Sequence, residues 1–298
     1  VLGHERDLPT LILGENETSG TDIPTIWIEK EFYTTKGTAQ IQSIFGSKEF
    51  PYPKPLALIT EILRACTNKN SIVLDFFAGS GTTLNAVNLL NKQDDGNRLC
   101  IMVTNNELSK KQVKSLEKSG INPGDELWNE HGICRAVTWP RTVYTITGKG
   151  ANGEALEGKY NCFDAEEYPM KDGFTANCEY FKLGFLDPTA VSLGMRFSEM
   201  LPTLWLKTGA KGKCPELSGE QIPDMLILPE NQFAVLINEN TFADFAEKLA
   251  DHPEIQTVFL ATDYEMNYQS MVKNLNVASA YQLYRDYLDH FRVNRGRS

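Results

Sequence analysis

The residues best suited to chemistry in this 298-residue sequence form the run DFFAGSGTT at positions 75–83. Its glycines, Gly79 and Gly81, suit a chain that turns sharply out of a strand, because glycine adopts positive φ and lets a ligand approach the backbone. Backbone amides at the start of a following helix attract a carboxylate or a phosphate. Thr82 or Thr83 could cap that helix or hydrogen-bond the ligand. The run therefore predicts a ligand site at a strand-to-helix turn.

Three kinds of ligand compete for such a turn. A phosphate-binding loop requires G-x-x-x-x-G-K-[ST], and no lysine follows Gly81. A dinucleotide fingerprint, G-x-G-x-x-G, requires a third glycine where this sequence has Leu84. The pattern that is left, F-x-G-x-G from Phe77 to Gly81, suits S-adenosylmethionine, whose carboxylate and amino groups would lie against the turn. We therefore favour S-adenosylmethionine over a nucleoside triphosphate or NAD.

The adenosine of such a ligand needs a partner for its ribose hydroxyls, and Glu107 is our candidate. It lies farther beyond Gly79 than the roughly 20 residues of the dinucleotide pattern, and the hydrophilic loop NKQDDGN accounts for the excess. Alternatively, Glu107 caps or decorates a helix that begins at Leu108. The ribose interpretation predicts that Glu107 ends the second strand.

Three neighbours of the glycines have two interpretations each. Asp75 could cap the turn backbone or face the ammonium group of the ligand. Phe76 and Phe77 could be core residues or contacts to the adenosine or methionine part, and we expect one of each.

These residues need elements that position them, and the first is a helix after the run PYPKP. Proline lacks the amide donor and biases the preceding residue toward extended conformations, so helix is blocked up to about Pro55. Pro55 suits a first helical position, and Leu56, Ile59, Ile62 and Leu63 then share one face.

A strand, a helix and a second strand surround the glycine turn. The segment 71–77 is short, apolar and partly β-branched, which predicts a buried strand. After the turn, Leu84, Val87 and Leu90 recur at helical spacing. The loop NKQDDGN then leads to a second apolar strand that ends near Thr104. This order predicts a parallel βαβ unit.

The remaining sequence predicts irregular structure with short strands over residues 1–50, where turn-forming clusters lie at 14–20 and 34–37. A polar run from Ala151 is typical of a domain boundary. Beyond it we expect a smaller α/β domain, while the segment from residue 280 is ambiguous between strand and helix. Its expected strands cover 178–186, 224–229, 233–238 and 257–263, and its expected helices cover 190–205, 241–251 and 264–275.

Length and composition agree with two globular domains, because each would hold about 150 residues. Hydrophobic residues make up 41% and charged residues 23%, values that exclude disorder or coiled coil for the whole chain. The net charge of -10 argues against a surface that grips DNA throughout. No apolar run suits a membrane helix and no leader opens the sequence, so we expect a soluble, cytoplasmic protein. The six cysteines and four histidines lack the spacing of a disulfide framework or metal site.

The order of these motifs resembles a known family. FPYPKPLALITEIL, SIVLDFFAGSGTT and IMVTNNE together resemble the cofactor-binding half of β-class DNA adenine-N6 methyltransferases, above all the modification (Mod) subunits of type III restriction-modification systems. The stretch 25–50 resembles the segment that leads out of target recognition, and the likeness covers roughly residues 20–145. In that family a lysine-proline motif precedes a helix beside the methionine end of the cofactor. The implied cofactor-binding residues are Lys54, Pro55, Asp75, Phe76, Phe77, Ala78, Gly79, Ser80, Gly81, Thr82, Thr83 and Glu107.

The resemblance implies three parts. Residues 1–50 would end the target-recognition or linker region, and 51–150 would form the S-adenosylmethionine-binding part of a Rossmann-like methyltransferase sheet. Residues 151–298 would form a C-terminal α/β domain for assembly or DNA contact. The implied partners are double-stranded DNA, a second copy of the protein and a restriction subunit.

The family's catalytic tetrapeptide, [DNS]-P-P-[YFW], does not occur in this sequence; the segment DPTA at 187–190 lacks the second proline and the aromatic. In the family the tetrapeptide precedes the cofactor motif, and this sequence opens on Val1. We therefore expect the C-terminal part of a longer enzyme, with no catalytic residue of its own. Such a part should be inactive alone and bind the cofactor weakly or not at all, because its sheet lacks the strands that carry the catalytic motif.

Other functions stay open at this point. The parent could methylate a small molecule or a protein, the region from residue 160 onward could be an assembly module, and a nucleotide-binding dehydrogenase is a third alternative. Arg135 and Arg141 could contact phosphates, but we expect surface arginines, and we expect Trp139 in the core. The local basic clusters are expected to be solubilising surface and comprise Lys207, Lys211, Lys213, Arg292, Arg295 and Arg297.

Overall fold

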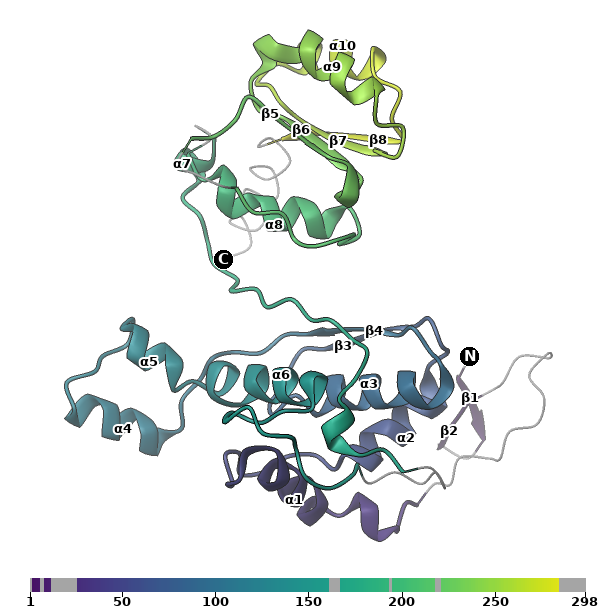
Figure 1. The fold of residues 1–298 in the computed structure, drawn as a ribbon, viewed down its shortest axis with the longest axis vertical. Coiled ribbons are helices and arrows are strands. Elements are labelled where there is room, and N and C mark those ends of the chain that lie inside the picture. Colours follow the sequence, from purple (N-terminus) through teal and green to yellow (C-terminus); the bar gives the residue numbers. More distant parts are fainter. Residues whose placement is uncertain are drawn as a thin grey trace. The chain divides into compact units, whose positions relative to one another are not determined.

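A computed structural model describes residues 2–5, 8–11, 26–160, 167–192, 195–217 and 221–283. The chain forms two compact units, Val1–Tyr180 and Phe181–Ser298 (Figure 1). Each unit is an arrangement of helices on a sheet, so the predicted α/β class is confirmed. No helix among the described residues is both long and apolar enough to span a lipid bilayer.

The predicted βαβ unit is present in the first compact unit. Strand β3 (Ile72–Asp75) pairs in parallel with β4 (Leu99–Met102), and α3 (Thr82–Asp94) connects them. Helix α2 (Leu56–Cys66) packs against α3. The predicted buried face of α3 is correct, because Leu84, Val87 and Leu90 are all buried.

The rest of the first unit surrounds this βαβ unit. The described strands β1 and β2 form an antiparallel pair, and short helices follow β4. The remaining elements are β1 (Leu2–Glu5), β2 (Leu8–Leu11), η1 (Lys30–Phe32), α1 (Thr34–Phe45), α4 (Lys110–Lys118), α5 (Glu126–Glu130), the π-helical η2 (Cys134–Thr138), α6 (Trp139–Thr147) and η3 (Met170–Asp172).

Three local expectations are corrected. Residues 34–37 are not a turn but the start of α1, where Gly37 lets the backbone of Pro53 approach: a Cβ there would lie 2.3 Å from its carbonyl oxygen. Ile62 is exposed, because the buried face of α2 runs through Ala57 and Thr60 as well as Leu56 and Leu63. Helix α3 continues to Asp94, into the expected loop.

The β3–β4 sheet is covered on one face. Val73 and Cys100 on that face pack against the core that α2 and α3 share. The other face carries apolar side chains that are largely exposed, namely Ile72, Leu74, Leu99 and Ile101. The prediction of a strand buried on both faces at 71–77, as parallel strands usually are, is therefore wrong: one face is partly buried and the other is largely exposed.

The division between the units lies at Tyr180 and Phe181, not at Ala151. Leu156, Tyr160 and Phe174 belong to the same core as α2 and α3. The polar run from Ala151 is thus a surface loop within the first unit.

The second unit is a four-stranded sheet in the order β5-β6-β7-β8, in which β5 is antiparallel and the others are parallel. One layer of its core lies against α8 and the other against α9 and α10 (Figure 1). Alternate residues of β7 explain this, since Phe259 enters the first layer and Val258 and Leu260 the second. The elements are α7 (Pro188–Ser192), α8 (Phe197–Lys207), β5 (Met225–Leu228), η4 (Pro229–Asn231), β6 (Phe233–Leu236), η5 (Glu239–Thr241), α9 (Phe242–Ala250), β7 (Thr257–Ala261), α10 (Glu265–Lys273) and β8 (Ser279–Leu283).

The sequence predicted most of this second unit. Strands β5, β6 and β7 and helices α9 and α10 lie where expected. The expected strand at 178–186 is wrong, because these residues form no regular element. The expected helix at 190–205 is two helices, α7 and α8. The ambiguous end begins as strand β8; residues 284–298, with Arg292, Arg295 and Arg297, lie outside the described residues, as do the turn cluster at 14–20 and Thr25.

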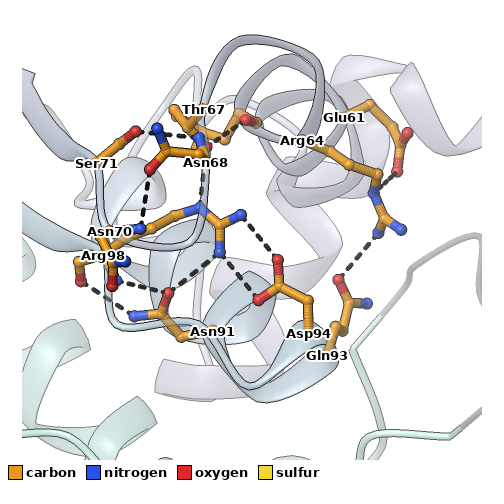
Figure 2. A network of polar contacts seen from close by, with 11 residues as sticks. Glu61, Arg64, Thr67, Asn68, Asn70, Ser71, Asn91, Gln93, Asp94 and Arg98 are labelled. Carbon is orange, nitrogen blue, oxygen red and sulfur yellow. Dashed lines mark hydrogen bonds and ion pairs between the residues drawn. The ribbon is translucent and has the colours of Figure 1, made fainter. Parts of the chain in front are cut away.

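A polar network ties together the C-terminal ends of α2 and α3 (Figure 2). Arg98 is buried and binds both carboxylate oxygens of Asp94, at 3.0 and 2.8 Å, and its Nε donates to the hydroxyl of Thr67. Asn91 accepts from the Arg98 amide and donates to its carbonyl oxygen. The network fixes the end of α3 that lies opposite the glycine turn.

Candidate functional site

The glycine turn leaves β3 and enters α3 through two residues with positive φ. Gly79 has a φ of 50° and Gly81 a φ of 77°. The Gly81 amide donates to the carbonyl of Ala78 at 2.7 Å, and the Ala78 amide donates to the backbone carbonyl of Val103 at 3.2 Å. The Val103 amide in turn donates to the backbone carbonyl of Asp75 at 2.7 Å. The turn is therefore fastened to the segment that directly follows β4.

The carboxylate of Asp75 braces the turn. Its Oδ1 accepts from the Phe77 amide at 2.9 Å, and its Oδ2 accepts from the hydroxyl of Thr83 at 2.6 Å. Of the two predicted roles, the structure supports the capping one. Because the Thr83 hydroxyl binds the Asp75 carboxylate across the turn, it helps to hold the turn in this conformation.

The two glycines face different surroundings. A Cβ on Gly79 would meet Phe50 and the Phe77 carbonyl no closer than 3.7 Å, which is ordinary contact. A Cβ on Gly81 would lie 3.4 Å from the methyl group of Thr138. A Cβ on either glycine would therefore make ordinary contacts, with Phe50 and the Phe77 carbonyl beside Gly79 and with Thr138 beside Gly81.

The lysine-proline motif lies beside the start of α3. The Thr82 hydroxyl is 3.4 Å from the Lys54 carbonyl oxygen. Pro55 is buried as the N-cap of α2, one residue before the helical position expected for it. The Lys54 side chain is exposed, and the backbone of this segment packs on Gly37.

Neither phenylalanine of the turn is a core residue. Phe76 is 61% exposed and Phe77 is 89% exposed. The expectation that one of them is core is wrong, because the sheet face next to them is uncovered. Ala78 and Ser80, by contrast, are buried.

Two residues that sequence reasoning missed, Thr138 and Arg141, form hydrogen bonds with the turn from a later part of the chain. Thr138, in η2, donates its hydroxyl to the Gly79 carbonyl at 2.6 Å. Arg141, in α6, donates through Nη1 to the Ser80 carbonyl and hydroxyl, both at 3.1 Å, and to the Thr82 hydroxyl at 2.9 Å. Arg141 was expected on the surface but is 1% exposed.

Arg141 lies among neutral polar groups. Its Nη2 donates to the side-chain oxygens of Asn85 (3.2 Å) and Gln40 (3.5 Å). Burial lowers the pKa of the Arg141 guanidinium to about 10, and the nearby Tyr160 opposes this shift. At neutral pH the side chain therefore still carries its positive charge.

The prediction that Glu107 ends the second strand is wrong, because β4 ends at Met102 and Glu107 lies in the loop that follows, with its side chain exposed. Its backbone carbonyl accepts from the Ile133 amide at 2.9 Å. Helix α4 begins later, with Ser109 as N-cap in a capping box with Gln112, so Glu107 is not that cap. Among the described residues no hydrogen bond joins the Glu107 side chain to the glycine turn, and its ribose role stays a prediction.

The other singled-out residues lie apart from the turn or make local contacts. Arg135 pairs with Glu126 at 3.2 Å, which agrees with a carboxylate-paired arginine. Trp139 is half-buried and packs against Tyr180. In the second unit, Lys207 lies over the ring of Tyr281.

The lysine-proline segment, the glycine turn and the first turn of α3 therefore lie next to one another. The N-cap of α3 is Gly81, which has no side chain to cap the amides behind it. Free amides and the positive end of the helix dipole bind an anionic group. An anionic group is therefore the kind of ligand that the start of α3 favours.

Comparison with known sequences matches the part of the chain that contains this turn to one family. Residues 4–122 match the model of a family described as DNA methylase. The resemblance to DNA methylases is confirmed over this stretch. The match covers less than half of the chain and includes the lysine-proline motif, the glycine turn, β3 and β4.

Three relatives share parts of this region. The Type III restriction-modification enzyme EcoPI Mod subunit of Escherichia phage P1 is 44% identical over 87 residues, which are 29% of this chain and 14% of the relative. The Type II methyltransferase M.KpnI of Klebsiella pneumoniae is 43% identical over 84 residues, 28% of this chain and 20% of its own. The StyLTI Mod subunit of Salmonella typhimurium is 35% identical over 124 residues, 41% of this chain and 19% of its own. The matching segments thus span at most a fifth of each relative.

Proposed function

We propose that this chain supplies the cofactor-binding part of a DNA adenine-N6 methyltransferase of a restriction-modification system, with S-adenosylmethionine as methyl donor. The observation that carries the proposal is the joining of two motifs at one point. Lys54 and Thr82 meet at the first residue of α3, directly after the turn that contains Gly79. The match to a family described as DNA methylase supports DNA as the substrate class, and the similarity to Mod subunits supports a restriction-modification system.

The residues around the turn fit the cofactor on one side. The carboxylate would lie beside Gly79 and the uncapped start of α3, where backbone amides stabilise negative charge. The exposed ring of Phe77 offers an apolar surface, and Glu107 is the proposed partner of the ribose hydroxyls. Gly81 lies against Thr138, so Gly81 serves packing in this proposal.

The chain's contribution to the reaction would be orientation. When bound, S-adenosylmethionine supplies a methyl group on a sulfonium. A target adenine must leave the duplex before its amino group can be reached, which costs a few kcal/mol. Holding the donor in one geometry replaces a bimolecular encounter, and this accounts for much of the rate in such transfers. In this proposal, none of the residues around the turn accepts hydrogen bonds from the adenine amino group.

Ligand-observed NMR with S-adenosylmethionine and the 298-residue chain tests this proposal. We expect weak, saturable binding that Gly79→Asp abolishes, because its carboxylate would repel that of the ligand. Gly79→Asn has the same size and also tolerates positive φ, so it should retain part of the binding. Gly153→Asp is the matched control, since Gly153 has a φ of 78° in open space away from the turn. Binding that is unchanged in Gly79→Asp would contradict the site.

A second function is favoured for the second unit. Residues 181–283 include their own sheet with core layers on both faces and none of the methylase motifs. We infer that this unit assembles the enzyme, by binding a second modification subunit or a restriction subunit. A pull-down of the restriction subunit by the full chain, compared with a chain ending at Tyr180, tests this. Equal capture by both would contradict it.

A further inference from the structure

Arg141 joins three parts of the first unit at the glycine turn. Its two terminal nitrogens donate to Ser80 and Thr82 at the turn, to Asn85 within α3 and to Gln40 of α1. Every one of these acceptors is a neutral oxygen. None of the ion pairs between described residues includes Arg141, and its Nε has no hydrogen-bond partner among them.

A second buried arginine of the same unit shows what a structural role looks like. Arg98, at the other end of α3, binds the carboxylate of Asp94 with two hydrogen bonds (Figure 2). A buried charge is costly unless it is paired. Arg98 meets this condition within the protein, whereas Arg141 places an unpaired positive charge directly behind the turn.

We propose that Arg141 is a positioning residue of the turn, whose charge selects a ligand that brings a carboxylate to Gly79. This inference rests on the proposed function. Arg141 does not touch the ligand, because its guanidinium is covered by Ser80 and Thr82. It acts by fixing the Ser80 carbonyl and hydroxyl, and by adding its charge to that of the α3 dipole.

The surroundings of Arg141 support a permanent charge. Its pKa of about 10 leaves the guanidinium protonated at neutral pH. The groups that face it are Gln40 from α1, Asn85 from α3 and Tyr160, whose own pKa burial raises to about 12. No group in this set ionises near neutral pH to cancel the charge.

The test compares two ligands that differ in one carboxylate, S-adenosylmethionine and its decarboxylated analogue. Their affinities for the full chain are measured with wild type, Arg141→Gln, Arg141→Lys and the control Arg98→Gln. We expect the wild type to prefer the carboxylate form by about tenfold, the strength of one charge-assisted interaction. Arg141→Gln should lose this preference, because it should weaken the binding of S-adenosylmethionine about tenfold more than that of the analogue.

The two other variants separate charge from folding. Arg141→Lys retains the charge and should retain most of the preference, even where its thermal stability falls. Arg98→Gln should lower thermal stability and leave the preference intact. Equal affinities of both ligands for the wild type, or an equal loss of both in Arg141→Gln, would overturn the role of Arg141 while the proposed function stands. Failure of both ligands to bind the wild type would overturn the binding site proposed beside Gly79, and this inference with it.

Discussion

Thr138 uses both ends of its side chain on the glycine turn. Its hydroxyl donates to the Gly79 carbonyl at 2.6 Å, and its methyl group fills the space beside Gly81. Thr138→Val keeps the methyl contact and removes the donor from a buried acceptor, so we expect it to lower the free energy of unfolding by about 1–2 kcal/mol. Thr138→Ser keeps the donor and should cost less. Urea unfolding of both variants measures this, and a larger loss in Thr138→Ser would show that packing dominates.

At the scale of single residues, the sequence predicts the turn but not what holds it. Gly79 and Gly81 are recognisable because their spacing implies positive φ. Thr138 and Arg141 lie some 60 positions later in a segment without a motif, and they reach the turn through the packing of α6 on α1 and α3. An arginine between Pro140 and Thr142 gives no signal of burial, since arginine is seldom buried.

At the scale of elements, β4 presents two unlike faces in neighbouring residues. Cys100 lies on the covered face, where burial raises the pKa of its thiol to about 12, while Ile101 lies on the uncovered face. The double variant Cys100→Ser/Ile101→Cys moves the thiol by one residue. We expect maleimide to label the new thiol at position 101 of the variant much faster than the Cys100 thiol of the wild type. Only a thiolate reacts readily, and burial keeps Cys100 protonated. Peptide mapping by mass spectrometry gives both rates, and equally slow labelling would mean that this face is covered.

The uncovered face explains why the sequence misleads here. An apolar run such as 71–77 indicates a strand with two apolar faces, and a parallel strand of this kind is usually buried on both. The pattern does not say which chain provides the cover. The described residues cover the face of Val73 with α2 and α3, and leave that of Leu74 exposed.

The Arg98 network at the end of α3 should make the stability of the chain depend on pH. Hydrogen bonds from Arg98 hold the pKa of Asp94 below its usual value, so the folded state binds a proton less readily than the unfolded state. The stabilisation is therefore complete above a pH of about 3.9, the ordinary carboxyl pKa, and is lost as the pH falls through the lower folded pKa. Asp94→Asn should destabilise the chain at neutral pH and lose this effect in acid. In the Arg98→Gln variant, Asp94→Asn should have the same effect on stability at neutral and at acidic pH. Urea unfolding at neutral pH and in acid measures this.

At the scale of the whole molecule, the sequence predicts two units and misplaces their border. Glycine and polar residues after Ala151 mark a surface loop as readily as a linker. What decides the border is core packing: Tyr160 and Phe174 enter the first core, and Lys92 reaches the Gly173 carbonyl at 3.3 Å. Such long-range contacts leave no local pattern in the sequence.

The first residues of the second unit should be the first site of proteolysis. Residues 181–187 form no regular element, and the side chains of Leu183 and Phe185 are more than 90% exposed. Chymotrypsin cleaves after such residues, and exposed segments without backbone pairing are cut before cores open. We expect limited digestion to cut after Leu183 or Phe185 and to leave two resistant fragments. The double variant Leu183→Ser/Phe185→Ser should slow this cleavage. The control Met266→Ser, at an exposed residue of α10, should not alter it. A first cut near Ala151 would place the border where the sequence alone puts it, and would contradict the packing of Tyr160 and Phe174 in the first core.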